Sequence, residues 1–151
     1  MRIKMLKNYK DLKVWQKSYG LCLDIYRITR KFPKKERYGL TSQIRRSAVS
    51  VPSNIAEGYG RKTTAGYIRS LYISYRSNCE LETQALLSGD LDYFEAGKLA
   101  ELIDKIAEVE RVLKALIKSL EKNTWPLESL NPRILVCLRQ ACMPCSRIFY
   151  N

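Results

Sequence analysis

Hydrophobic and polar positions separate most clearly between residues 43 and 61. At about 100° per residue, the turn of an α-helix, one side of this segment carries the apolar residues Ile44, Ala48, Val51, Ile55 and Tyr59. The opposite side carries Arg46, Ser50, Ser53, Asn54, Glu57 and Arg61. This segregation predicts an amphipathic helix with a buried apolar seam and a polar, partly basic outer face.

Pro52 lies in the middle of this segment. A proline inside a helix lacks the N–H donor, and its ring presses against the carbonyl four residues earlier, here that of Ala48. We expect the helix to bend there, or to break and restart with Ser50 as a new N-cap. Small residues beside the seam allow another helix backbone to approach closely; they are Ser47, Ala48, Ser50, Ser53 and Ala56. The segment is therefore either the tightest-packed helix of a bundle or one whose arginine-bearing face also meets a partner.

The same periodicity predicts three further helices. The first runs to about residue 32, has Asp11 as its N-cap and ends before Pro33. Its apolar residues at steps of three and four are Leu12, Trp15, Tyr19, Leu23 and Tyr26. The second helix, the one around Pro52, spans about 40–59. The third helix begins after a Thr63 or Thr64 cap and ends near residue 87. The fourth helix starts near Tyr93. A break is expected at 88–90.

These four helices, joined by short turns, predict an all-α, antiparallel, up-down-up-down four-helix bundle over residues 1–124. No strand-like alternation of useful length precedes residue 125. Residues 125–151 form a separate, irregular C-terminal extension, because Pro126, Pro132 and Pro144 interrupt it. We expect this extension to be poorly packed or disordered, or to contain one short helix at 134–142 that contacts the bundle.

Positive charge is concentrated in the first half of the chain. The whole chain has a net charge of +12, and residues 1–62 alone hold 16 Lys and Arg against 4 Asp and Glu. Residues 63–124 hold 8 against 10. A one-sided basic surface is typical of proteins that bind polyanions, most often nucleic acid. It also suits an acidic protein partner or simple solubility.

The chain contains no histidine. This excludes histidine-dependent acid–base catalysis, histidine-containing triads and the Glu-x-x-His di-iron site of many helix bundles. No glycine-rich phosphate loop is present, and the C-x-x-C pair Cys142 and Cys145 lacks further good zinc ligands. We therefore expect no enzyme activity, no cofactor and no metal.

The cysteines and the N-terminus indicate a cytoplasmic protein. Five cysteines, an odd number scattered along the chain, do not resemble a secreted disulfide framework. Cys22 and Cys79 lie on apolar helix faces, where they would pack as small core residues. The first residues lack the apolar run of a signal peptide, and no window approaches the roughly 18 to 20 apolar residues of a membrane span.

The basic residues of the first two helices are the candidate nucleic-acid-binding set. These residues are Lys13, Lys17, Lys34, Lys35, Arg37, Arg45, Arg46, Arg61 and Lys62. Lysine and arginine neutralise phosphates without reading sequence. An exposed tyrosine, such as Tyr38 or Tyr59, can stack on an unpaired base. We expect most of the ten tyrosines to pack instead in the core or in a subunit interface, with the ring buried and the hydroxyl in contact with water.

Three stretches carry a family resemblance: DLKVWQKS at 11–18, the segment 26–61, and NCELETQ at 78–84. They closely resemble the small four-helix-bundle proteins encoded in intervening sequences of bacterial 23S ribosomal RNA genes. The same fold group includes the accessory variability determinant proteins of diversity-generating retroelements. The resemblance covers about residues 11–120, and its most distinctive part is R-R-x-x-x-S-x-P-x-N-I-A-E-G. The positions on this pattern are Arg45, Arg46, Pro52, Asn54, Glu57 and Gly58.

The resemblance implies an antiparallel four-helix bundle that assembles into a barrel-like homopentamer with a basic surface. It also implies binding to nucleic acid and, in retroelements, to a reverse transcriptase. Our main hypothesis is therefore a non-enzymatic, oligomeric accessory protein that binds RNA more than DNA. The alternative is a protein-interaction or oligomerisation scaffold that does not bind nucleic acid directly.

Overall fold

The computed structural model describes residues 8–123, and four α-helices make up most of this part of the chain. The helices are α1 (Lys13–Ile28), α2 (Leu40–Tyr59), α3 (Thr64–Asp90) and α4 (Ala96–Asn123). Short 3-10 turns are found at Tyr9–Asp11, Thr29–Lys31 and Lys34–Glu36. No strand occurs among the described residues, so the predicted all-α class is confirmed.

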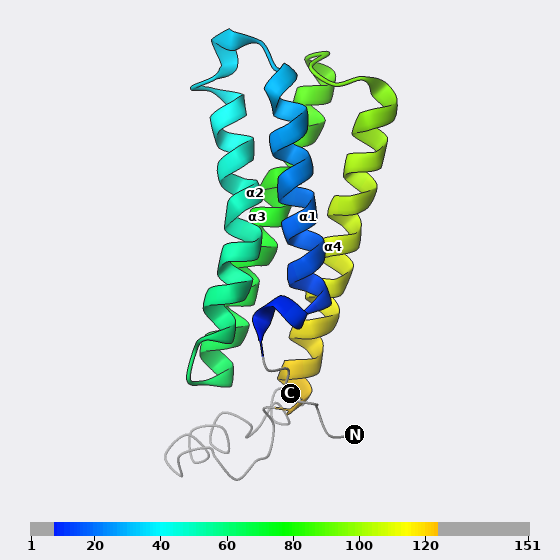
Figure 1. The fold of residues 1–151 in the computed structure, drawn as a ribbon. Helices are drawn as coiled ribbons and strands as arrows, with labels where there is room; N and C mark the ends of the chain where they lie inside the picture. The colour runs from blue at the N-terminus through cyan, green and yellow to red at the C-terminus, as the bar shows by residue number, and fades with distance from the viewer. Residues whose placement is uncertain (1–7, 124–151) are drawn as a thin grey trace, which may run out of the picture.

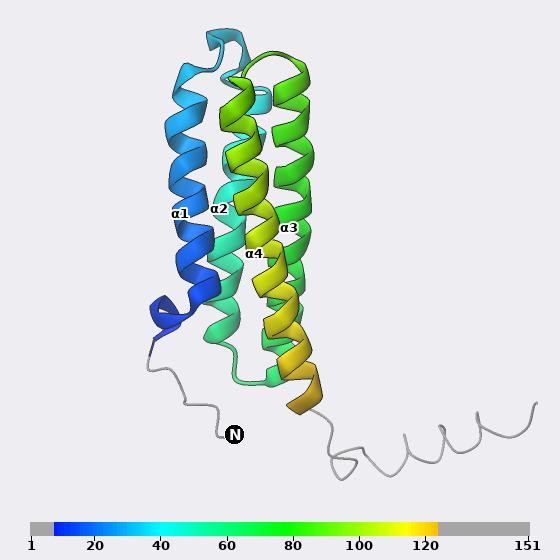
Figure 2. The same ribbon diagram turned by 90° about the vertical axis from the view of Figure 1, so that its right-hand side faces the viewer.

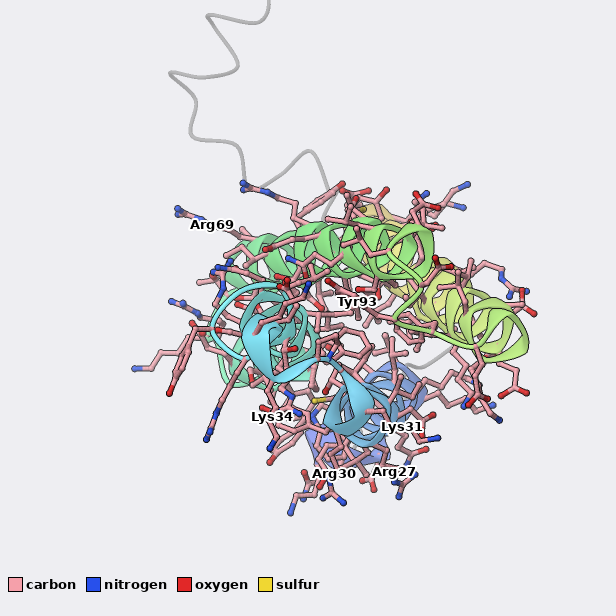
Figure 3. The ribbon with its side chains drawn as sticks, turned by 90° about the horizontal axis from the view of Figure 1, so that it is seen from above. Arg27, Arg30, Lys31, Lys34, Arg69 and Tyr93 are labelled. Carbon is pink, nitrogen blue, oxygen red and sulfur yellow. The ribbon has the colours of Figure 1, made fainter. Side chains whose placement is uncertain are left out.

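The helices run up and down in chain order (Figures 1 and 2). The α1–α2 and α3–α4 connections lie at one end of the bundle, and the α2–α3 connection lies at the other. Each helix packs against its neighbours in the chain, and α4 closes the bundle against α1. Seen from the α1–α2 end, α1 and α3 occupy opposite sides of the molecule (Figure 3).

The core lies between the four helices and is filled by aliphatic side chains. Its buried members include Val14, Leu21, Ile25, Ile44, Val51, Ile55, Leu71, Leu81, Leu102, Ile106, Val109, Leu113 and Ile117. The apolar seam predicted for the second helix lies largely in this core, with Ile44, Ala48, Val51 and Ile55 buried. Burial of such side chains supplies most of the stability of a bundle of this kind.

Helices α2 and α3 approach each other closely through small residues. A Cβ atom on Gly58 would lie 2.8 Å from the Cβ of Ser70 and 2.8 Å from the ring of Tyr67. The buried Ser74 hydroxyl donates to the Val51 carbonyl over 2.9 Å. The predicted close approach of a second helix backbone is therefore confirmed.

Helix α2 continues through Pro52 without a break, so the predicted restart with Ser50 as a new N-cap is wrong. Pro52 is buried within α2, which packs against α3. Ser50 instead lies within 2.8 Å of the Ser77 hydroxyl. Its carbonyl accepts a hydrogen bond from Asn54 Nδ2 over 2.8 Å, an additional bond from a side chain one turn ahead.

The start of the first helix differs from the prediction. Asp11 lies in the preceding 3-10 turn, and Leu12, which forms no side-chain cap, precedes α1. The cap at this end is instead Asn8, whose Oδ1 accepts from the Lys10 N–H over 3.1 Å. By contrast, Thr63 caps α3 as predicted, because its hydroxyl accepts from the Gly66 N–H over 3.1 Å.

The buried side of α1 is not the side that the aromatic residues indicated. The buried residues are Val14, Ser18, Leu21 and Ile25. Tyr19, Leu23 and Tyr26 remain between 40% and 47% exposed. Large rings at steps of three and four imitate a core stripe, but the smaller side chains on the adjacent side fit the space left by α2 and α4.

The connection between α3 and α4 is shifted relative to the prediction. Helix α3 continues through the expected break at 88–90, and α4 begins at Ala96 instead of near Tyr93. The Ser88 hydroxyl donates to the Gln84 carbonyl over 2.7 Å, so it adds to the helix instead of ending it. Asp92, with a φ of 57°, makes the turn. The prediction for residues 125–151 lies outside the described residues.

Candidate nucleic-acid interface

The predicted basic residues do not form one continuous surface. Lys34, Lys35 and Arg37 belong to the α1–α2 connection, with Arg45 and Arg46 in the first turns of α2. Lys13 and Lys17 lie at the start of α1, and Arg61 and Lys62 follow α2, so these four belong to the opposite end (Figure 1). At 1.5 Å per residue, the 20 residues of α2 separate the two ends by roughly 30 Å.

Three of the predicted cations are paired with carboxylates of the same chain. Lys17 Nζ lies 2.7 Å from Glu108 Oε1, and Arg46 lies 3.0 Å from Glu80 Oε1. Arg61 pairs with Glu57 one turn earlier. The hydrogen bond from Lys17 is the main reason why the pKa of Glu108 lies below its ordinary value. These three cations contribute less to the field that an approaching polyanion meets.

A second group of cations has no such neutralisation. We call Arg30, Lys34, Lys35, Arg37 and Arg45 the cationic corner. Within residues 8–123, no carboxylate oxygen lies within 4.0 Å of the side-chain nitrogens of these residues. Figure 3 shows Arg30 and Lys34 on the α1–α2 side of the molecule, with Arg69 on the α3 side.

The local sequence explains why the cations of this corner face outward. Phe32 is buried, and its ring lies 5.5 Å from that of Tyr93 and 5.2 Å from that of Phe94. Pro33 then starts a short 3-10 turn, and Glu36 Oε2 accepts from the Leu40 N–H over 3.2 Å. The one carboxylate of the turn is thus used to satisfy the N-terminus of α2, which leaves the lysines and arginines unpaired.

Arg45 is held in a defined orientation. Its Nε donates to the Thr29 hydroxyl over 2.8 Å, and its guanidinium carbon lies 5.0 Å from the centre of the Tyr26 ring. Thr29 is itself buried and donates to the Ile25 carbonyl over 2.8 Å. Since Nε is engaged, the two terminal nitrogens of the guanidinium are the ones that remain for a ligand.

The corner surrounds a pocket of about 300 Å³ between the end of α1 and the start of α2. Its lining residues are Thr29, Arg30, Phe32, Pro33, Lys34, Arg37, Thr41 and Arg45. The lining contains four cations and no acidic residue. Such a pocket favours an anionic ligand.

The two tyrosines proposed for base stacking have different environments. Tyr38 is 88% exposed and lies 5.8 Å from the Arg37 guanidinium, so its ring is accessible beside the corner. Tyr59 is half-buried at the other end, with ring centres of Tyr9 and Tyr67 at 6.5 and 6.4 Å. Of these two, Tyr38 therefore offers an accessible ring face next to unpaired cations.

The family model of the 23S rRNA-intervening sequence proteins matches residues 10–115. The match covers α1, α2, α3 and most of α4, together with the cationic corner. The chain belongs to this family.

The fold is shared with a solved structure. It is that of a Bacteroides thetaiotaomicron protein of unknown function from the S23 ribosomal protein family. Its sequence is 24% identical, the alignment covers 72% of this chain and 98% of that chain, and the TM-score is 0.67. No curated protein matches the chain.

The family positions of α2 have structural roles within this chain. Pro52 and Gly58 are buried, and Gly58 is a point of close approach to α3. Asn54 donates to the Ser50 carbonyl, and Glu57 pairs with Arg61. The close approach at Gly58 explains why a residue without a side chain stands at this position.

Sequence reasoning missed Arg30, Thr29 and Thr41 as members of the site. Arg30 had a signal, because it begins the basic run of residues 30–35. The threonines had none, since their position beside the cations depends on how α1 and α2 pack.

Within residues 8–123, no group of acidic or sulfur ligands could hold a metal, and no helix is long and apolar enough to cross a membrane. Cys142 and Cys145 lie outside the described residues.

Proposed function

We propose that the protein is a cytoplasmic, non-enzymatic nucleic-acid-binding protein that uses the cationic corner to contact phosphates. The proposal rests on one observation: five cations at one end of the bundle have no carboxylate partner in the described chain. Binding a polyanion releases its counterions, which favours association without reading the base sequence.

RNA is the preferred ligand in this proposal. The exposed ring of Tyr38, beside Arg37, suits stacking on an unpaired base, and RNA loops and ends offer such bases. The family name refers to 23S rRNA intervening sequences, which agrees with an RNA ligand.

The salt dependence of binding tests this function. Five phosphate contacts on a single strand predict a log–log slope of about −3.5 for affinity against salt, at about −0.7 per phosphate. We expect the double variant Lys34→Glu and Lys35→Glu to lose more than about tenfold in affinity for single-stranded RNA, measured by fluorescence anisotropy.

The matched control is Lys118→Glu with Lys122→Glu on α4, which changes the net charge by the same amount. This control should retain affinity within about threefold, because its charges lie far from the corner. Equal losses in both variants, or binding that does not depend on salt, would refute the corner as the binding surface.

A second candidate function is a self-assembling scaffold. Ile73, Leu86 and Leu87 on α3 are exposed, and so are Tyr19, Leu23 and Tyr26 on α1. Because α1 and α3 lie on opposite sides of the bundle (Figure 3), the two apolar faces can meet head-to-tail between copies. This arrangement supports a closed ring, and the resemblance implies five copies.

The mass of the protein in solution, measured by light scattering, tests whether copies of the chain assemble. Ile73→Glu with Leu87→Glu should reduce the measured mass to that of one chain, whereas Ala107→Glu, at an exposed position on α4, should leave it unchanged. A wild-type protein that has the mass of one chain at every concentration would contradict the ring.

A further inference from the structure

The pocket in the cationic corner differs from an ordinary basic surface in having a buried donor. Thr41 lines the pocket, is only 6% exposed, and has no hydrogen-bond partner for its hydroxyl. A buried hydroxyl without a partner costs free energy, and native structures rarely leave one. The hydroxyl oxygen of Thr41 is enclosed by protein atoms, so a rotation of the side chain about the Cα–Cβ bond would bring the hydroxyl to an acceptor oxygen of a ligand in the pocket.

The other polar groups of the pocket are also donors. Thr41 lies in the first turn of α2, where the helix dipole favours negative charge. Arg45 has its Nε bonded to Thr29, which leaves its terminal nitrogens for a ligand. Arg30, Lys34 and Arg37 complete the cationic wall. A ligand that suits this set carries several acceptor oxygens and more than one negative charge.

A terminal phosphate meets this description better than an internal one. A phosphate monoester presents three terminal oxygens and a charge of about −1.5 to −2 near neutral pH. An internal phosphodiester has one charge, and its strand must leave the pocket on both sides. The volume of about 300 Å³ is at the small end of ligand sites and has room for one terminal nucleotide.

We propose that this pocket binds a terminal phosphate monoester, either at the end of an RNA strand or on a free nucleotide. The strand-end form of the proposal rests on the RNA-binding function proposed above. It adds an end preference that phosphate contacts alone do not produce, because contacts along a strand are the same for every internal phosphate.

The test compares three RNAs of one sequence: one with a 5′-phosphate, one with a 3′-phosphate and one with hydroxyls at both ends. We expect a terminal phosphate to tighten binding by about tenfold or more, through charge-assisted hydrogen bonds that the hydroxyl end cannot form. A nucleoside monophosphate, used as competitor, should remove this gain.

Thr41→Val is the decisive variant. It has nearly the shape of threonine and removes only the unpartnered hydroxyl, so the fold is retained. It should reduce the gain from a terminal phosphate by a larger factor than it reduces the affinity for the hydroxyl-ended RNA. Lys35→Gln, in the corner but outside the pocket lining, should weaken all three RNAs equally.

The outcomes distinguish a failure of the pocket proposal from a failure of the proposed RNA-binding function. Equal, salt-dependent binding of all three RNAs overturns the pocket proposal and leaves the proposed function intact. Absence of RNA binding together with binding of the nucleoside monophosphate overturns the function and assigns the pocket to a free nucleotide. No binding of either ligand overturns both.

Discussion

Arg45 and Thr29 are joined by a 2.8 Å hydrogen bond from the arginine Nε to the threonine hydroxyl. The bond links the first part of α2 to the turn that follows α1. It also occupies Nε, so the two terminal nitrogens of the guanidinium are the ones that remain for a ligand. The geometry of the cationic corner thus depends on a buried residue that carries no charge.

Thr29→Val should weaken RNA binding without changing the charge of the protein. Loss of the hydroxyl frees the Arg45 side chain to adopt other rotamers, and ordering it again on binding costs free energy. We expect the affinity for single-stranded RNA to fall about threefold to tenfold, or roughly 0.7 to 1.4 kcal/mol. Ser53→Ala, which removes a hydroxyl bonded only to the Val49 carbonyl, is the control and should bind normally.

Gly58→Ala should destabilise the bundle. The added Cβ would lie 2.8 Å from the Cβ of Ser70, so α2 and α3 must separate. Overpacking of this kind costs about 1 to 3 kcal/mol.

Gly20→Ala in α1 should instead stabilise the protein, because no neighbouring group lies within 4 Å of the position that its Cβ would take. Alanine there favours the helix by about 1 kcal/mol. Denaturant unfolding of both variants measures the difference, and similar midpoints would contradict it.

Tyr67 should be among the last tyrosines of the described chain to ionise. Burial, followed by the nearby Tyr59, raises the pKa of Tyr67 to about 12. The neutral form is favoured in the folded state, so its stabilising effect is complete below the unfolded value near 10 and is lost as the pH rises through 12. Ultraviolet titration should show a late tyrosinate step that is missing in Tyr67→Phe.

The same substitution tests the cost of a buried hydroxyl. The Tyr67 hydroxyl is buried and has no hydrogen-bond partner. Replacement by phenylalanine should therefore leave stability unchanged or raise it by about 1 kcal/mol at neutral pH. A clear loss of stability would show that the hydroxyl makes a favourable contact in solution.

The ion pair of Lys17 and Glu108 should contribute to acid sensitivity. The folded-state pKa of Glu108 lies below its ordinary value of 4.5, with the hydrogen bond from Lys17 as the main cause. The contribution is therefore present above this value and is lost as the pH falls through the folded-state pKa. Lys17→Met should make the decrease in Tm between neutral and acidic pH smaller. The effect should be slight because the side chains of Lys17 and Glu108 are both partly exposed. Lys114→Met, which removes the ion pair with Glu110, serves as a comparison.

Much of the bundle could be predicted because helical periodicity is a local property. The seam of Ile44, Ala48, Val51 and Ile55 lies in the core, and α2 has the predicted bounds. The side of α1 that is buried could not be predicted, since both Tyr19 and Leu21 lie on plausible apolar stripes. Which stripe faces inward depends on the shape of the partner helices.

The sequence by itself determined four amphipathic helices, the family and the excess of positive charge before residue 63. Only the tertiary structure decided which cations remain unpaired. Lys17, Arg46 and Arg61 are balanced by carboxylates, and two of these, Glu108 and Glu80, come from a neighbouring helix of the bundle. Arg30 and Arg45 instead line one pocket together with Thr29 and Thr41. Charge is additive along a chain, but its field depends on which groups folding brings within a few ångströms of one another.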